Sequence, residues 1–195
     1  MQKIGWYLPL GFMLFSGSLL SAGACRSATP PDPDATATIK DLMLSKIDPA
    51  ADAVWLSVTP VQTPEGTVET VPKNDEEWNK VRQGAMTLTE GANLLMTPGR
   101  HVAGPNDKSE TPGVELEPLE MEELINKDRA SWEMRAKGLH DAGMAALRAA
   151  EAKDPQKVFE VGEEIERACE NCHSQYWYPN EKIPAVPTEL KQTGQ

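Results

Sequence analysis

Apolar residues recur at spacings of three and four through most of this chain, and this period most constrains what the chain can fold into. Such spacing places them along one side of an α-helix. Four segments show it, at about 39–58, 74–96, 119–153 and 155–177. No segment alternates like a strand over a useful length. Because four amphipathic helices can bury their stripes only against one another, the sequence predicts an all-α fold, an antiparallel four-helix bundle.

Capping residues mark where these helices begin. Asn74 is the predicted N-cap of the second helix, with Glu77 three residues on as its capping-box partner. Asp154 followed by proline is typical of the start of the fourth. Asp48 followed by Pro49 has the same pattern inside the first segment. That segment is therefore predicted to be either a kinked helix or two short ones.

Segments rich in proline and glycine mark the predicted loops between the helices. Residues 59–73 and 99–118 are rich in both and are predicted loops. The third helix is weakened by glycines at 138 and 143. We expect a signal peptide at 1–24, a flexible tether at 25–38, the helical domain at 39–179 and a polar tail at 180–195.

The N-terminus has the order of a secretory leader: a basic start, an uncharged and mostly apolar stretch over 4–20, and small residues over 21–25. Three interpretations stay open. Ala22-Gly23-Ala24 suits ordinary signal peptidase, whereas Gly23-Ala24-Cys25 resembles the end of a bacterial lipobox with Ala22 in place of the usual leucine. An uncleaved anchor is the third. We expect a periplasmic protein, with Cys25 as the candidate for a lipid anchor.

Cleavage immediately before Cys25, with lipid on its thiol, is the form we predict. Lipidation would account for the third cysteine, which has no partner for a disulfide framework. The intact mass of the mature protein tests this prediction. A mass that leaves Cys25 unmodified at the new N-terminus would reject lipidation while export would stand.

The charge balance bears on partners. The chain has 19 Lys+Arg against 30 Asp+Glu, a formal net charge of −11. Nucleic acid is not an expected partner, since its phosphates attract Lys and Arg. An acidic surface instead suits a basic redox partner protein. Membrane contact is expected only through the candidate lipid anchor.

The motif Cys169-x-x-Cys172-His173 lies on the predicted fourth helix. Two cysteines one helical turn apart can each bond a haem vinyl group, and the adjacent histidine can bind the iron. The run therefore predicts one covalent haem c. A thioredoxin-like pair would require a preceding strand. A zinc site would need a fourth ligand, for which His101 and His140 are candidates, and a disulfide between the two cysteines would be a small strained loop.

A single C-x-x-C-H near the C-terminus, on the last of four helices, resembles the class II c-type cytochromes, the cytochrome c′ and c-556 group. The resemblance covers about 38–179 and includes the order of the helices. That family continues the motif as C-x-x-C-H-x-x-[YF], which Tyr176 fits, but a basic residue often follows and this chain has Trp177. The loop at 99–118 is longer than the family suggests. Some relatives dimerise through their first two helices, so the resemblance makes a homodimer a candidate state.

The resemblance also identifies the residue that decides between two functions. In the family the sixth iron position is either filled by a methionine of the first helix or left open. Met43 lies on the apolar stripe of the first helix and is the candidate ligand, with core packing as the alternative. His101 is a weaker candidate, and the remaining methionines are predicted to be core or surface residues: Met86, Met96, Met121, Met134 and Met144.

A haem with histidine and methionine on its iron changes oxidation state with little change in ligands. The sequence therefore predicts an electron carrier rather than an enzyme. If Met43 is not a ligand, the iron is five-coordinate, and the resemblance then implies binding or sensing of nitric oxide or carbon monoxide.

Overall fold

The computed structural model describes residues 34–64 and 66–181. The chain divides into two units, Met1–Asp32 and Pro33–Gln195, and every described residue belongs to the second. The predicted signal peptide, the lipidation candidate Cys25 and most of the polar tail lie outside the described residues. Within the described part of the chain, no helix has both the length and the apolarity needed to cross a membrane.

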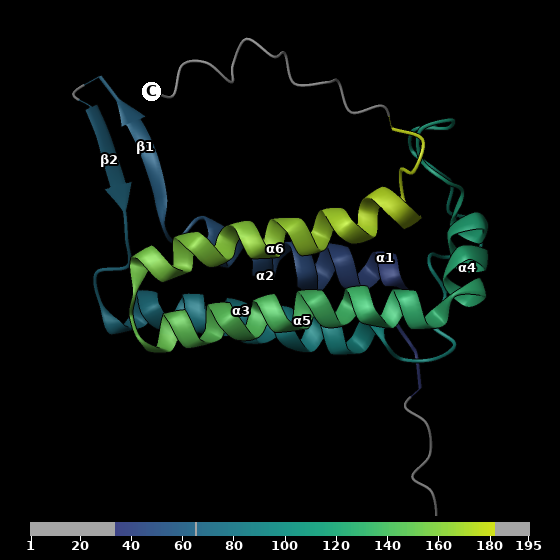
Figure 1. Ribbon diagram of the computed structural model, residues 1–195, viewed down its shortest axis with the longest axis horizontal. Coiled ribbons are helices and arrows are strands. Elements are labelled where there is room, and N and C mark those ends of the chain that lie inside the picture. The colour runs from purple at the N-terminus through teal and green to yellow at the C-terminus, as the bar shows by residue number, and fades with distance from the viewer. Residues whose placement is uncertain (1–33, 65, 182–195) are drawn as a thin grey trace, which may run out of the picture. The chain divides into compact units, whose positions relative to one another are not determined.

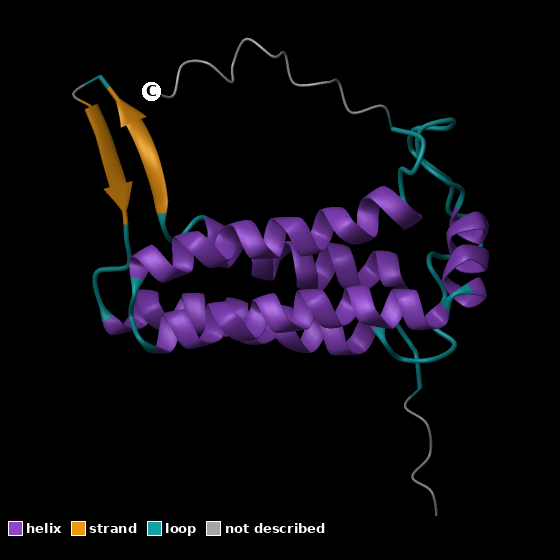
Figure 2. Ribbon diagram, viewed as in Figure 1, coloured by secondary structure: helices purple, strands orange, loops and turns teal. Residues whose placement is uncertain are grey.

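Most of the described residues are helical, as the all-α prediction requires (Figures 1 and 2). The elements in chain order are α1 Ile39–Leu42, the π-helix η1 Met43–Ile47, α2 Asp48–Trp55, β1 Thr59–Thr63, β2 Gly66–Thr70, α3 Asp75–Leu95, α4 Pro118–Lys127, α5 Arg129–Glu151 and α6 Pro155–Tyr176.

Four helical segments enclose a shared apolar core. α3 packs against α5, α5 against α6, α6 against α2, and α2 against α3 (Figure 1). The predicted stripe of the second helix is buried at every position: Trp78, Val81, Ala85, Leu88, Ala92 and Leu95. On α6 the predicted stripe is also buried, except that Cys169 is half-exposed. The period of three and four therefore located the core correctly on these two helices, whereas Leu124 of the predicted third stripe is exposed.

The first helical segment is continuous but changes its winding. The N-cap prediction for Asp48 is wrong, because Asp48 has helical dihedral angles and α2 follows η1 without a capped break. Its backbone N–H donates to the carbonyl of Met43, five residues earlier. Pro49 supplies the physical reason: its ring has no N–H and collides with the carbonyl four residues back in a regular α-helix. The wider π-helical turn accommodates it.

The third predicted helix is two helices. The chain leaves helical geometry at Asp128, with φ −136° and ψ 70°, and the Asp128 carboxylate accepts a hydrogen bond of 3.0 Å from the Ser131 N–H. Asp128 thus caps α5 instead of continuing α4, as aspartate favours caps over helix interiors. α4 is a separate ten-residue helix that contacts α5 and α6.

The predicted caps of the other two helices are present. The Asn74 side chain accepts from the Glu77 N–H at 2.9 Å, and Asp154 accepts from the Lys157 N–H at 3.0 Å. Glu77 differs in detail: its carboxylate accepts from the N–H of Lys73 at 2.6 Å, one residue before the expected partner. Both helices therefore begin where the sequence predicts.

The segment predicted as a loop over 59–73 contains a two-stranded antiparallel hairpin. β1 pairs with β2 from Thr59 opposite Thr70 to Thr63 opposite Gly66. Threonine and valine recur in both strands, and these β-branched residues favour extended backbone. The strands were missed because each is only five residues long and Pro60 suggested a loop.

Two glycines of α5 provide a matched test of how closely α3 and α5 pack. A Cβ on Gly143 would lie 2.6 Å from Oγ1 of Thr89 and 3.1 Å from its backbone nitrogen, whereas a Cβ on Gly138 would meet nothing within 4 Å. Gly143→Ala should lower the free energy of unfolding by about 1–3 kcal/mol through overpacking. Gly138→Ala should raise it by about 0.5–1 kcal/mol through helix propensity. Thermal or urea unfolding measures both, and equal effects would contradict the close contact.

Candidate functional site

A cavity of about 280 Å³ opens where the start of α1, the start of α5 and the end of α6 meet. Its lining is mainly apolar, and α4 and the segment that precedes α4 supply further walls. Cys172 and His173 of the C-x-x-C-H motif line this cavity, and so does Met43 of η1. The structure thus brings the adjacent Cys172 and His173 together with Met43, which lies far from them in the chain.

The motif residues share the last two turns of α6. Cys172 is 8% exposed and Cys169, one turn earlier, is half-buried against the core. Both are free thiols in the structure, so the disulfide alternative is not seen. His173 is half-buried, and the rings of Trp177 and Tyr178 contact it edge-on, with centroids at 5.0 and 5.9 Å. Aromatic packing therefore restricts the imidazole.

Burial controls the protonation of these groups. It raises the pKa of the Cys169 thiol to about 12, with Glu166 and Cys172 adding to the effect, and that of Cys172 to about 11. Redox-active cysteine pairs depend on a lowered thiol pKa, so this environment is unlike theirs. Burial also lowers the pKa of His173. A neutral imidazole is the form that binds a metal ion.

The predicted sixth ligand, Met43, is the first residue of η1 and is partly buried against the core. A second thioether was missed: Met121 of α4, predicted as core or surface, lines the same cavity. The sequence contained one usable indication, since Met121 lies one helical turn before Ile125, an apolar residue that is buried in the core. Its place at the cavity depends on the packing of α4 beside α6.

The segment between α3 and α4 is fastened to the start of α1. The N–H groups of Ile39 and Lys40 donate to the carbonyls of His101 and Val102, at 2.9 Å each. The buried Arg100 donates through Nε to the Leu94 carbonyl at 3.0 Å and through Nη1 to the Ala37 carbonyl. First-turn N–H groups of α1 thus find acceptors in this segment, which aligns it along the cavity.

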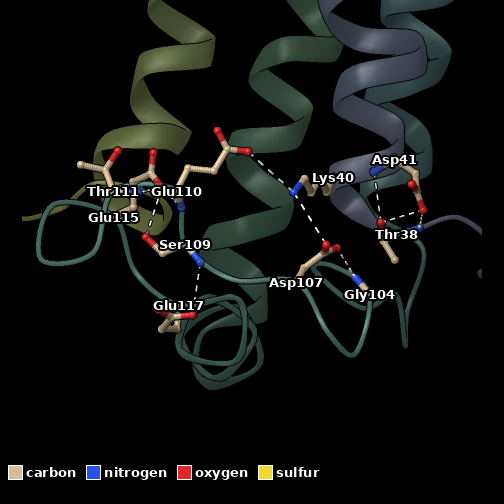
Figure 3. A network of polar contacts seen from close by, with 10 residues as sticks. All are labelled: Thr38, Lys40, Asp41, Gly104, Asp107, Ser109, Glu110, Thr111, Glu115 and Glu117. Carbon is tan, nitrogen blue, oxygen red and sulfur yellow. Dashed lines mark hydrogen bonds and ion pairs between the residues drawn. The ribbon is translucent and has the colours of Figure 1, made fainter.

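The rest of this segment is held by carboxylates (Figure 3). Glu115 accepts from the N–H groups of Glu110 and Thr111 at 2.9 and 3.0 Å and from the Ser109 hydroxyl at 3.2 Å. The ammonium group of Lys40 lies 3.9 Å from carboxylate oxygens of both Asp107 and Glu110. These are long, exposed ion pairs that contribute little to stability. The longer loop noted in the sequence therefore forms a wall of the cavity.

The two other predicted histidine candidates do not line the cavity. His101 is exposed, and its Nδ1 lies 3.0 Å from a Glu122 carboxylate oxygen. His140 is half-buried, and its Nδ1 lies 3.0 Å from the Asp141 carboxylate. Across residues 34–64 and 66–181, no three His, Cys, Asp or Glu side chains converge as a group able to hold a metal ion. The structure thus supplies no partners for the zinc alternative in the part that it describes.

The residues around the cavity fit a haem. The mainly apolar lining suits the macrocycle, and the His173 imidazole and the Met43 thioether are available to iron. Of the two motif cysteines, Cys172 lines the cavity, and Cys169 lies one turn earlier on α6 without lining it. Tyr176 also lines the cavity, but its hydroxyl is covered by neighbouring atoms and has no hydrogen-bond partner among the described residues. Such a group in a native protein usually has an acceptor.

Comparison with known proteins found no match to this chain. No family model, no curated protein and no solved structure matches the chain. The assignment of the site therefore depends on its own residues and geometry.

Proposed function

We propose that this protein is an exported mono-haem c-type cytochrome that transfers electrons, with haem c held by α6 in a four-helix bundle like that of the class II c-type cytochromes. The observation that carries the proposal is the convergence of Cys172, His173 and Met43 on one mainly apolar cavity. The predicted secretory leader and the C-x-x-C-H motif both favour the periplasm, because c-type attachment occurs outside the bacterial cytoplasm.

Cys169 and Cys172 are the residues that would hold haem c covalently, each through one thioether bond to a vinyl group. Their one-turn spacing on α6 would let both bonds form on the same side of the helix. Burial keeps both thiols protonated, and Cys172 lines the mainly apolar cavity.

The iron ligands determine the kind of redox behaviour. His173 supplies an imidazole nitrogen, and Met43 supplies a neutral sulfur that raises the reduction potential. With both positions filled, no site remains for a substrate on the iron. An acidic chain of net charge −11 would then favour docking with a basic donor or acceptor protein.

An optical spectrum of the ferric and ferrous protein tests the proposal. A low-spin spectrum with the far-red band of methionine–ferric ligation is the expected result. A high-spin spectrum that shifts when carbon monoxide is added would contradict electron transfer through a six-coordinate haem. The alternative, a five-coordinate protein that binds nitric oxide or carbon monoxide, would then be favoured, since the apolar lining of the cavity also suits a small neutral gas.

A further inference from the structure

Two aromatic rings contact the imidazole of His173. They belong to Trp177 and Tyr178, and their centroids lie 5.0 and 5.9 Å from that of the imidazole. The Tyr178 hydroxyl donates to a Glu170 carboxylate oxygen at 2.7 Å, so this ring is held by a residue eight positions earlier in the chain. Trp177 is held differently, by a segment that is distant in the sequence.

The segment between α3 and α4 reaches the end of α6 at Trp177. The N–H of Leu116 donates to the Trp177 carbonyl at 2.8 Å. Desolvation raises the pKa of the Glu115 carboxyl, but its hydrogen bonds, including one with the Trp177 side chain, outweigh this effect and hold the pKa below its usual range. Two adjacent residues of the segment therefore bind both the backbone and the side chain of Trp177.

Glu115 also joins this contact to the rest of the segment. Its carboxylate accepts from the N–H groups of Glu110 and Thr111 at 2.9 and 3.0 Å and from the Ser109 hydroxyl at 3.2 Å (Figure 3). A carboxylate offers about four lone-pair sites, enough for these three donors and the indole N–H. One side chain thus closes the turn over 109–115 and holds Trp177 at the same time.

We propose that Glu115 positions the proximal imidazole: through Trp177 it fixes the orientation of the His173 ring about the bond from nitrogen to iron. This inference rests on the proposed function. A ring bound through one nitrogen can rotate about that bond, and the indole, packed edge-on at 88°, restricts the rotation. The two departures from the class II pattern, Trp177 and the long loop at 99–118, thereby act together.

The test compares Glu115→Gln with Glu110→Gln in the haem-loaded protein. Both changes remove one negative charge from the same segment at the same cavity, but the Glu110 carboxylate lies 3.9 Å from the Lys40 ammonium group and is highly exposed. At position 115 the new amide keeps one acceptor oxygen and turns an NH₂ group towards donors. Paramagnetic NMR shifts of the haem methyl groups in the ferric protein report the direction of the imidazole plane. We expect Glu115→Gln to redistribute these shifts and Glu110→Gln to leave their pattern intact.

Trp177→Leu tests the route from Glu115 to the imidazole. It should also redistribute the methyl shifts, and Glu115→Gln added to it should cause little further change, because both act through one contact. Hydrogen exchange in the unaltered protein gives a measurement that does not depend on folding of a variant. The Leu116 amide should be protected, since it donates to the Trp177 carbonyl. An unprotected amide there would overturn the inference.

The outcomes separate this inference from the proposed function. If the haem is covalently bound but Glu115→Gln alters the methyl pattern no more than Glu110→Gln does, the inference is wrong and the cytochrome proposal stands. Additive effects of Glu115→Gln and Trp177→Leu would show that Glu115 does not act through the indole, which also overturns it. If the unaltered protein carries no covalent haem, the proposed function fails and this inference fails with it.

Discussion

Protein matured by c-type assembly machinery should keep its haem through denaturation and acid–acetone extraction, and the Cys169→Ala/Cys172→Ala double variant should lose all of it. Thioether bonds survive unfolding, whereas a haem held only by iron ligands is released. Each single variant should retain one thioether and give an altered optical spectrum. Intact mass and a haem stain on a denaturing gel measure both results.

Ser174→Ala is a suitable control for the cysteine variants. Ser174 lies on the same helix, and its hydroxyl donates to the Glu170 carbonyl at 2.6 Å, so the change alters local hydrogen bonding but no thiol. This variant should keep a covalent haem. Complete extraction of haem from the unaltered protein would show that the central claim is wrong, whatever the variants do.

Met43→Ala should open the sixth position of the iron. The ferric spectrum should turn from low-spin to high-spin, the reduction potential should fall, and carbon monoxide should bind the reduced protein rapidly. Stability should also fall by about 2 kcal/mol, near the low end for deletion of a core methionine, because Met43 is only partly buried. Loss of stability is expected for packing and for ligation alike, so the spectrum decides between them.

Met121→Ala provides the matched comparison, because Met121 is the other thioether on the cavity wall. We expect it to stay low-spin with the potential little changed. If Met121→Ala turns high-spin and Met43→Ala does not, the sixth ligand comes from α4. If the unaltered protein is already high-spin and neither change affects the spectrum, both methionines are packing residues and the gas-binding alternative is favoured.

Features that depend on a few neighbouring residues were predictable from the sequence. The buried stripe of α3 follows from the helical period. The start of α3 follows from Asn74, whose side chain accepts a hydrogen bond from the N–H of Glu77, three residues later. The C-x-x-C-H spacing likewise places two thiols and an imidazole on adjacent turns of α6. Fold class and the candidate haem ligands on this helix required no long-range information.

Some short sequences are compatible with two local backbone conformations, and local pattern alone could not predict which of the two forms. Asp128 can sit inside a helix or cap the next one, and the packing of α4 beside α5 and α6 accompanies the capped form. Asp48-Pro49 can begin a helix or follow a π-helical turn, and here the continuous burial of Ile47, Ala50 and Val54 favours the turn. Five-residue strands at 59–70 carried too weak a pattern to be recognised.

The sequence by itself determined the helical period, the caps of α3 and α6 and the chemistry of the motif, because each acts across one or two turns of the same helix. Only the tertiary structure decided which methionines line the cavity, that the segment before α4 forms one of its walls, and that the Tyr176 hydroxyl is buried with no hydrogen-bond partner in the part of the chain that the structure describes. These features arise where α1, α4, α5 and α6 meet. Contacts between residues far apart in the chain depend on the packing of whole helices, and no local pattern records them.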